Sequence, residues 1–308
     1  MRISTIVVAE GLCPDISLTL SSAKDVSAEV ILVDIGLEPS IRTQLESDNP
    51  DIKIFSLPKP DYVELIRQET LAYAAHDWVL LLDPDEYLSP ELVKLIRESA
   101  LDEGYTHLKI PRQNYIFNKW ISHSRWWPDY QIRLFRKDSM NWPKTLHAQP
   151  ELTGKGFIVG AFEDQKLEMR ACAIVHHNYT SILQYLEKAI RYARVDANSI
   201  TVSNEPYTIL DASKRATSEF ISRFFADKGY KDGVHGLILA ILQVFYNLLV
   251  YMFVWEKQSY PEVTQTNLFK ATYQLFITTS KEMLYWMSRE KIVKGPQKVM
   301  NWVKRRVM

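Results

Sequence analysis

The chain has 308 residues, 46% of them hydrophobic and 24% charged, which suits a globular protein with one large core or a core and a helical appendage. Its formal net charge is zero, so no overall field attracts nucleic acid and no nucleic-acid partner is expected. Its two cysteines, Cys13 and Cys172, lack metal-like spacing, which argues against a zinc site or a disulfide framework and favours the cytoplasm.

Apolar runs and helical patterns alternate along the first hundred residues. The first run leads directly to Glu10 and lacks the pattern of a secretory signal, so no cleaved leader is expected. Runs that are apolar on both faces fit strands covered by helices, and their alternation predicts an α/β fold with a mostly parallel, doubly wound sheet. The expected strands are Ile3–Ala9, Val30–Asp34, Ile52–Leu57 and Trp78–Leu82. The expected helices between them are Ile16–Ser22, Ser40–Ser47 and Tyr62–Ala75.

A fourth helix is expected from Pro90 to about Leu101, with Ser89 as its N-cap. After Gly104 the sequence becomes dense in aromatic residues and Arg, which predicts a mixed, partly antiparallel half. The strands expected there are Tyr105–Arg112, Gln131–Arg136 and Glu168–Val175. From residue 180 onward the pattern is helical, with breaks near 204–206, 228–236, 260–261 and 295–296. We therefore expect one α/β domain over residues 1–180 and a helical region over 181–308.

Three carboxylates follow the fourth expected strand, in the segment Asp83-Pro84-Asp85-Glu86. Open α/β sheets bind ligands at the carboxyl ends of their strands, and carboxylates this close repel one another unless a cation lies among them. Oxygen ligands favour Mg²⁺ or Mn²⁺, usually with substrate phosphates completing the coordination. The alternative is an acidic turn that caps the next helix, but Ser89 already fills that position. The segment therefore predicts a divalent-metal site with a DXD motif.

These carboxylates belong to a longer series of short motifs in a fixed order. The series comprises 33–36, Arg67, 77–86, 111–115, 127–136, His147, 176–181, 185–188 and 191–193. In this order the motifs resemble the GT-A fold glycosyltransferases of family 2, specifically the branch of the lipopolysaccharide inner-core β-1,4-glucosyltransferases. The resemblance extends over about residues 1–257. It implies a Rossmann-like GT-A fold and a metal-dependent, inverting transfer of a hexose from a nucleotide-diphosphate sugar, with a UDP-sugar favoured.

The resemblance also implies roles on the nucleotide side of the site. The residues expected to bind the nucleotide sugar are Glu10, Asp34, Arg67 and Asp83. The expected metal ligands are Asp83, Asp85 and His176, with Glu86 orienting them. From the residues alone, Asp34 is as readily a turn-forming residue, Arg67 a solvated helix charge and His176 a structural histidine.

The acceptor side is expected in the aromatic segment around residue 127. Aromatic faces stack on sugar rings, and a nearby carboxylate can act as the general base because inversion needs a deprotonated attacking oxygen. The residues expected to bind the acceptor are Trp126, Trp127, Tyr130, Arg133 and His147. Arg133 also fits a core strand. Three carboxylates compete for the role of catalytic base: Asp129, Glu163 and Asp164.

Three segments on the nucleotide side depart from the family pattern. Ala9-Glu10 stands for Asn-Glu, the loop after Asp34 lacks hydroxyls and a second acid, and Arg67-Gln68 stands for Arg-Asn. These departures leave the base and sugar of the donor open. Two other classes of protein remain alternatives: a nucleotidyltransferase and an inactive membrane-associated scaffold. A nucleotidyltransferase would carry a Gly-rich basic loop after its first strand, and residues 10–14 do not form one.

Two C-terminal segments predict a membrane partner. Leu237–Trp255 approaches the ~20 apolar residues that cross a bilayer, but Gln243 and Asn247 share a face and favour a surface or buried helix over a span. From Arg289 to Arg306 there are seven Lys/Arg and one acidic residue. We expect peripheral attachment to the inner face of the cytoplasmic membrane, where the acceptor would be a cell-envelope glycan or a lipid-linked glycan. The alternative is a tail helix packed on the protein's own core.

Overall fold

The computed structural model describes residues 2–60, 63–98, 104–142, 150–160, 170–203, 207–290 and 295–307. The chain divides into two compact units. One, here called the sheet unit, contains Met1–Tyr115 and Trp127–Asn178. The other, here called the helical unit, contains Ile116–Trp126 and Tyr179–Met308.

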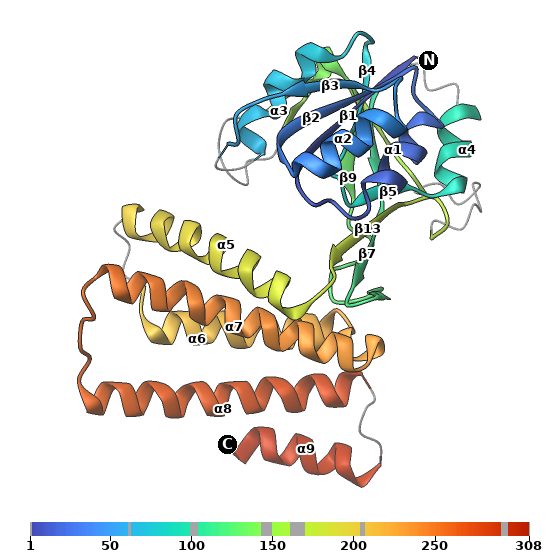
Figure 1. Ribbon diagram of the computed structural model, residues 1–308. Coiled ribbons are helices and arrows are strands. Elements are labelled where there is room, and N and C mark those ends of the chain that lie inside the picture. Colours follow the sequence, from blue (N-terminus) through green and yellow to red (C-terminus); the bar gives the residue numbers. More distant parts are fainter. Residues whose placement is uncertain are drawn as a thin grey trace. The chain divides into compact units, whose positions relative to one another are not determined.

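The sheet unit is organised around a mixed, mostly parallel sheet (Figure 1). Its strands within the described residues are, in spatial order, β12 (Lys155–Ile158), β6 (Tyr105–Ile110), β9 (Gln131–Arg136), β4 (Trp78–Leu82), β1 (Ile3–Gly11), β2 (Glu29–Leu37) and β3 (Lys53–Ser56). β4, β1, β2 and β3 are parallel neighbours, whereas β9 is antiparallel to both β4 and β6. The predicted class of sheet and its antiparallel half are confirmed.

The central strand β4 is buried on both faces, as its unbroken apolar sequence predicts. Trp78, Leu80 and Leu82 point into one core cluster, and Val79 and Leu81 point into the cluster on the opposite face. Side chains alternate along a strand, so a strand with helices on both sides needs apolar residues at every position. This burial holds the end of β4, and therefore the acidic segment after it, at a defined place.

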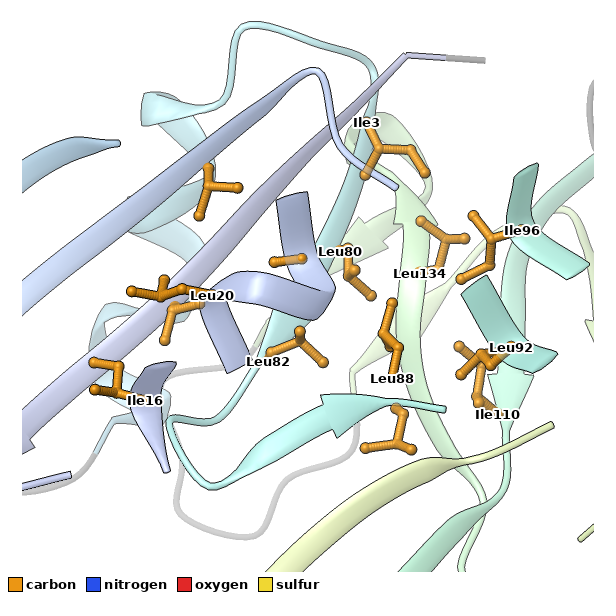
Figure 2. Close-up of a cluster of buried hydrophobic side chains, with 14 of the residues drawn as sticks. Ile3, Ile16, Leu20, Leu80, Leu82, Leu88, Leu92, Ile96, Ile110 and Leu134 are labelled. Atoms are coloured by element: carbon orange, nitrogen blue, oxygen red, sulfur yellow. The ribbon is translucent and has the colours of Figure 1, made fainter. Parts of the chain in front are cut away.

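Helices cover both faces of the sheet. Helices α1 (Ile16–Lys24), α2 (Pro39–Asp48) and α4 (Pro90–Glu98) cover one face, and α3 (Glu64–Thr70) with the short turn η1 (Leu71–Tyr73) covers the other. Figure 2 shows Leu20 of α1 and Leu92 of α4 directed toward the same cluster as Leu80. The predicted cap is confirmed, because the backbone N–H of Leu92 donates to the hydroxyl of Ser89 at 3.2 Å.

Shorter elements complete the sheet unit and lead out of it. They are β5 (Glu86–Leu88), β7 (Arg112–Ile116), β8 (Lys119–Trp120), η2 (Lys137–Ser139), β10 (Met140–Asn141), β11 (Glu151–Leu152) and β13 (Ile174–Tyr179). The predicted strand over 105–112 is two strands, since Pro111 has no N–H to donate and interrupts the ladder. The predicted strand over 168–175 is wrong in its bounds: residues 170–173 form turns, and β13 begins at Ile174.

The helical unit contains α5 (Ile182–Ser203), α6 (Ile209–Ile221), η3 (Ser222–Ala226), η4 (Gly229–Asp232), α7 (Val234–Lys257), α8 (Gln265–Arg289) and α9 (Pro296–Val307). Helix α7 packs against α5 and α6, while α8 packs against α6 and α9 (Figure 1). The predicted breaks at 260–261 and 295–296 fall between helices, and the break at 204–206 lies outside the described residues. The segment from Ile116 to Trp126 contributes Ile116 and Ile121, which pack against Leu239 of α7.

Glu29, at the start of β2, ties several neighbouring segments together. Its Oε1 accepts hydrogen bonds from the Ser4 hydroxyl and from the Ala75 backbone N–H, both at 2.6 Å. Its Oε2 lies 2.6 Å from Nζ of Lys53 on β3. Burial alone would raise the pKa of Glu29, but these donors and the Lys53 charge outweigh it and lower the pKa from 4.5 to about 2.

This depressed pKa predicts a contribution of Glu29 to acid sensitivity. The stabilisation is fully present above the unfolded-state pKa near 4.5 and is lost as the pH falls toward the folded-state pKa of about 2. We expect wild type to exceed Glu29→Gln in free energy of unfolding at about pH 7, with a difference that shrinks at about pH 3. Urea unfolding of both proteins at each pH measures this difference in the free energy of unfolding. A difference of the same size at both values would contradict the assignment.

Candidate active site

The acidic segment forms a tight turn at the carboxyl end of β4. The backbone N–H of Glu86 donates to the carbonyl of Asp83 at 3.0 Å, and the backbone N–H of Asp83 donates to Oε2 of Glu86 at 3.1 Å. This reciprocal pair directs the Glu86 side chain inward, where it is 0% exposed, and leaves the Asp85 carboxylate 30% exposed. Glu86 and Asp85 are therefore neighbours on one turn but lie in different environments.

Arginines neutralise two of these carboxylates, that of the buried Glu86 and that of Asp83, whose side chain is 35% exposed. Glu86 Oε1 accepts from Nη1 of Arg112 on β7 at 2.7 Å and from Nη2 of Arg133 on β9 at 2.6 Å. The same Arg133 nitrogen binds Asp83, and Nη2 of Arg67 lies 3.5 Å from the other oxygen of Asp83. The repulsion expected from three adjacent acids is thus relieved within the protein for two of them.

The arginines also set the ionisation of these acids. Burial alone would raise the pKa of Asp83, but the positive charges of Arg133 and Arg67 outweigh it and hold the pKa well below its usual range. Burial and Asp83 would raise the pKa of Glu86, and Arg133 with Arg112 lowers it below the usual range. Both carboxylates are therefore ionised at neutral pH, and neither is a proton donor there.

Asp129 is held by Arg112 and by two side-chain amides. Its Oδ2 accepts from Nε and Nη2 of Arg112 at 2.9 and 2.6 Å and from Nδ2 of Asn114 at 3.0 Å. Its Oδ1 accepts from Nε2 of Gln131 at 2.8 Å. Burial would raise the pKa of Asp129, but Arg112 and the amides outweigh it and lower the pKa. Asp129 is therefore ionised at neutral pH, and its donors also weaken it as a proton acceptor.

Asn114 connects Asp129 to His176. Because the Asn114 amide nitrogen donates to the Asp129 carboxylate, its Oδ1 is the atom that faces Nδ1 of His176, at 2.7 Å. A carbonyl oxygen accepts only, so Nδ1 of His176 carries a proton in this pair, and in the tautomer protonated at Nδ1 the Nε2 atom has a lone pair. That lone pair faces Oδ2 of Asp85 at 3.6 Å.

Two acceptors that face each other across 3.6 Å suit a cation between them. Ligand atoms about 2.1 Å from one ion, as for Mg²⁺ and similar metals, stand roughly 3.0–3.7 Å apart. Asp85 and His176 therefore fit as two protein ligands of a divalent ion, with phosphate oxygens and water as the others. In the part of the chain that the structure describes, no cluster of three or more His, Cys, Asp or Glu could hold a metal without such help.

The residues predicted to bind the nucleotide lie at the same edge of the sheet, with Ala9 beside Asp34 and Val7 beside Leu82. The Asp34 side chain accepts from the backbone N–H groups of Gly36 and Leu37, both at 2.8 Å, and from Arg42 at 2.6 Å. These contacts are the ones expected if Asp34 is a turn-forming residue, the alternative to a nucleotide ligand. Gly36 has φ +125°, a conformation that favours glycine.

Glu10 pairs with Lys59 at 2.8 Å, and Arg67 pairs with Asp83 as described above. Neither pairing by itself assigns a nucleotide contact, so both residues remain predictions as nucleotide ligands.

The residues predicted for the acceptor differ in exposure and in the unit to which they belong. Arg133 is 4% exposed and its guanidinium is occupied by Asp83 and Glu86, so an acceptor contact would require it to leave them. Tyr130 is exposed and belongs to the sheet unit with Trp127, whereas Trp126 belongs to the helical unit. The predictions for His147, Glu163 and Asp164 lie outside the described residues.

Sequence reasoning missed Asn114 and Arg112 as members of the site. Both lie in the motif over 111–115, two positions apart and therefore on the same face of β7, which places them on the side that faces Asp129. Polar residues at alternate positions of an expected strand were the available signal.

Charged groups at the carboxyl ends of the strands of a mixed α/β sheet are common to many classes of enzyme. A comparison with known families identifies the class to which this chain belongs. Residues 6–163, just over half of the chain, match the model described as glycosyl transferase family 2. The chain belongs to this family, and the protein is a glycosyltransferase. The expected GT-A class of fold with a helical C-terminal region is confirmed by the family match together with the mixed sheet and the helices after residue 181.

Similar proteins include an uncharacterized glycosyltransferase of Rickettsia conorii, 24% identical over 266 residues that cover 80% of this chain and 88% of that protein. Among solved structures, S. aureus TarS 1–349 is 13% identical with a TM-score of 0.40, and the match covers 94% of this chain and 82% of that one. Glucosyl-3-phosphoglycerate synthase from Mycobacterium tuberculosis, in complex with Mn²⁺, UDP and phosphoglyceric acid, is 18% identical with a TM-score of 0.29. That match covers 37% of this chain and 43% of the other. The family assignment rests on the sequence match.

Proposed function

We propose that this glycosyltransferase moves a hexose from a UDP-sugar to a cell-envelope glycan or lipid-linked acceptor, with inversion and with Mg²⁺ or Mn²⁺ on the donor diphosphate. The supporting observation is the pair formed by the accessible Asp85 carboxylate and Nε2 of His176, beside acids that arginines already neutralise. A divalent ion there would neutralise charge on the departing diphosphate. The solved structure of the mycobacterial synthase is that of a complex with Mn²⁺ and UDP. The metal proposed for this chain rests on its own Asp85 and His176.

The roles of the other residues follow from their contacts. Asp83 keeps Arg67 at the carboxyl edge of the sheet, where a cation can attract the phosphates of the nucleotide. Glu86 and Arg133 form the buried support that fixes the turn carrying Asp85. Asn114 holds the tautomer of His176 that leaves Nε2 free for the metal.

Within the family we propose the branch of the lipopolysaccharide inner-core β-1,4-glucosyltransferases. The support is the ordered series of motifs from Asp34 to Ala193, which extends beyond the matched family region into α5. Calorimetric titration with UDP, GDP and dTDP, with and without Mn²⁺, tests the donor. Metal-dependent binding of UDP alone supports the proposal. Tighter binding of GDP or dTDP would assign a different donor and would put the branch aside.

Replacement of Asp129 by asparagine tests the catalytic base. If Asp129 accepts the acceptor proton, Asp129→Asn lowers kcat by about 10²–10⁴-fold with little change in the affinity for UDP. Single-turnover transfer and UDP titration measure the two effects. Asp164→Asn and Glu163→Gln are the comparison variants. A rate that survives Asp129→Asn and collapses in either of those would assign the base to the later pair and leave Asp129 as a partner of Arg112.

We further propose that the protein attaches to the inner face of the cytoplasmic membrane through the region after residue 180, while residues 1–180 carry the transfer site. Among the described residues, α7 is long and apolar enough to cross a membrane. Its most apolar stretch has a mean hydropathy of 2.2, and 28% of that stretch is buried. Exposed apolar residues recur along one face of α7 at Leu237, Ile241, Phe245, Met252 and Trp255. Such a face suits the boundary between headgroups and lipid chains.

Helix α9 adds apolar and cationic side chains. Met300, Trp302 and Val303 are exposed, while Asn301 is buried, so these three apolar side chains are not buried against the rest of the unit. Lys304, Arg305 and Arg306 form the basic end. A cation near an anionic leaflet adds about 1 kcal/mol.

Flotation with liposomes tests the attachment. We expect the full chain to float with anionic liposomes, less with neutral ones, and less at high salt, because salt screens the basic tail. Deletion of residues 289–308 should remove the salt-dependent part. Recovery in the soluble fraction under every condition would contradict the proposal. Flotation that survives both salt and deletion would assign the attachment to α7.

A further inference from the structure

A groove of about 510 Å³ lies between α6 and α8 in the helical unit. Leu210 and Ile221 of α6 and Ala271 and Leu275 of α8 contribute apolar surface to its walls. Its volume lies within the range of roughly 300–1,000 Å³ that is typical of sites for small molecules. The groove takes no part in the sugar-transfer site described above.

The groove stays open because α8 turns its large side chains away from α6. Phe269, Tyr273 and Phe276 are 73%, 56% and 69% exposed, and none of them lines the groove. The α8 positions that do line it include the small residues Ala271 and Thr278. No residue of α8 is fully buried, so the helix contributes little to the unit's own core.

The groove has the dimensions of one alkyl chain. It extends from Leu210 to Ile221 along α6 and from Lys270 to Glu282 along α8, about 16–18 Å at 1.5 Å per residue. A long, narrow and largely apolar space of this kind fits an extended hydrocarbon better than a compact polar ligand.

The charges along the groove have a direction. Figure 1 shows α6 and α8 running the same way, so Lys214 and Lys270 lie toward one end and Glu282 toward the other. Neither lysine forms an ion pair with any residue that the structure describes. Asp211 is within electrostatic reach of Lys214, but its carboxylate accepts from the backbone N–H and the hydroxyl of Thr208 at 3.1 and 2.6 Å.

We propose that the α6–α8 groove binds one alkyl chain of an anionic phospholipid, with the phosphate between Lys214 and Lys270. The apolar walls take the chain, and the two lysines take the negative charge. Glu282 at the opposite end disfavours the reverse orientation. This assignment is independent of the transfer reaction and distinguishes one bound lipid from general adhesion to a bilayer surface.

Photo-crosslinking of the full-length protein tests the groove. The probe is phosphatidylglycerol with a diazirine in one acyl chain, and mass spectrometry of the peptides locates the label. We expect label on residues 209–221 and 265–289. Ala271→Trp fills the groove and should lower labelling about tenfold, whereas Thr272→Trp, on the exposed side of the same helix, should not. Gln274→Phe is a second filling variant, in case Ala271→Trp alters the fold.

The charge is tested by Lys214→Glu with Lys270→Glu, and Lys257→Glu at the end of α7 is the control. The double variant should lose most of its preference for phosphatidylglycerol over phosphatidylcholine, while the control keeps it. Competition with unlabelled palmitate and with inorganic phosphate separates lipid from fatty acid and from a bare anion.

Equal labelling of Ala271→Trp, Gln274→Phe and Thr272→Trp would overturn the proposal. Stronger competition by palmitate or by phosphate would overturn the phospholipid, and label shared between two copies of the chain would assign the groove to self-association.

Discussion

Replacing Asp85 with alanine should reduce sugar transfer by about 10³-fold or more and leave the free energy of unfolding within about 0.5 kcal/mol of wild type. The Asp85 carboxylate is partly exposed, and its recorded partner is His176 at 3.6 Å, so its loss leaves no buried charge without a partner. What is lost is a ligand to the metal that stabilises the departing diphosphate. Transfer rates, urea unfolding and Mn²⁺ affinity by electron paramagnetic resonance measure the three quantities.

Asp138→Ala is the matched control for Asp85→Ala. Asp138 is an exposed carboxylate of the same unit whose nearest cation, Arg136, lies 3.9 Å away, so its removal should change neither rate nor metal affinity. Near-normal turnover of Asp85→Ala in Mn²⁺-containing buffer would contradict the metal assignment. A variant that keeps its Mn²⁺ affinity but loses transfer would move Asp85 from the metal to another role.

Glu86→Ala should show the opposite pattern, with a loss of about 3–5 kcal/mol in the free energy of unfolding. Glu86 has no exposed surface and accepts from Arg112, Arg133 and the backbone N–H of Asp83. Its removal leaves two buried guanidinium groups with one partner fewer each, and it opens the turn that positions Asp85. Urea unfolding monitored by tryptophan fluorescence gives the number.

Two further variants separate charge from packing. Glu46→Ala removes an exposed acid that pairs with Arg42 at 3.0 Å, and it should cost less than about 0.5 kcal/mol. The double variant Glu86→Leu with Arg133→Leu should cost less than the two single replacements together, because each single one leaves the other member of the pair with one charged partner fewer. A cost for Glu86→Ala no larger than that for Glu46→Ala would show that the buried pairs do not stabilise the fold.

Much of the sheet unit could be predicted because its signals are local. The strand over Trp78–Leu82 is apolar at every position, and Ser89-Pro90 has the chemistry of a helix start. Both therefore appear in the structure where they were expected. The strand predicted over 105–112 failed only at Pro111, and there the missing N–H decided the outcome.

The environment of the acids could not be predicted in the same way, because it depends on pairs far apart in the sequence. Arg133 meets Asp83 across 50 positions and Arg112 meets Glu86 across 26, and only the antiparallel placement of β9 next to β4 brings the first pair together. The sequence argument therefore identified the acidic turn, with Asp83 and Asp85 as metal ligands and Glu86 orienting them, but it did not identify the arginines that pair with Asp83 and Glu86. Two of the three acids are neutralised by the protein's own arginines.

The chain enters its helical unit twice, and this bears on how such a protein can be divided or recombined. The segment from Ile116 to Trp126 interrupts the sheet unit, and its Ile116 and Ile121 are buried against Leu239 of α7. A fragment that stops at residue 180 would expose both isoleucines, and Ile116 lies only two residues beyond Asn114, whose amide joins Asp129 to His176. The helical unit is therefore not a tail that gene fusion or truncation can exchange freely. A chimera that takes its C-terminal helices from a relative would need the relative's 116–126 segment as well, so both pieces must be inherited together.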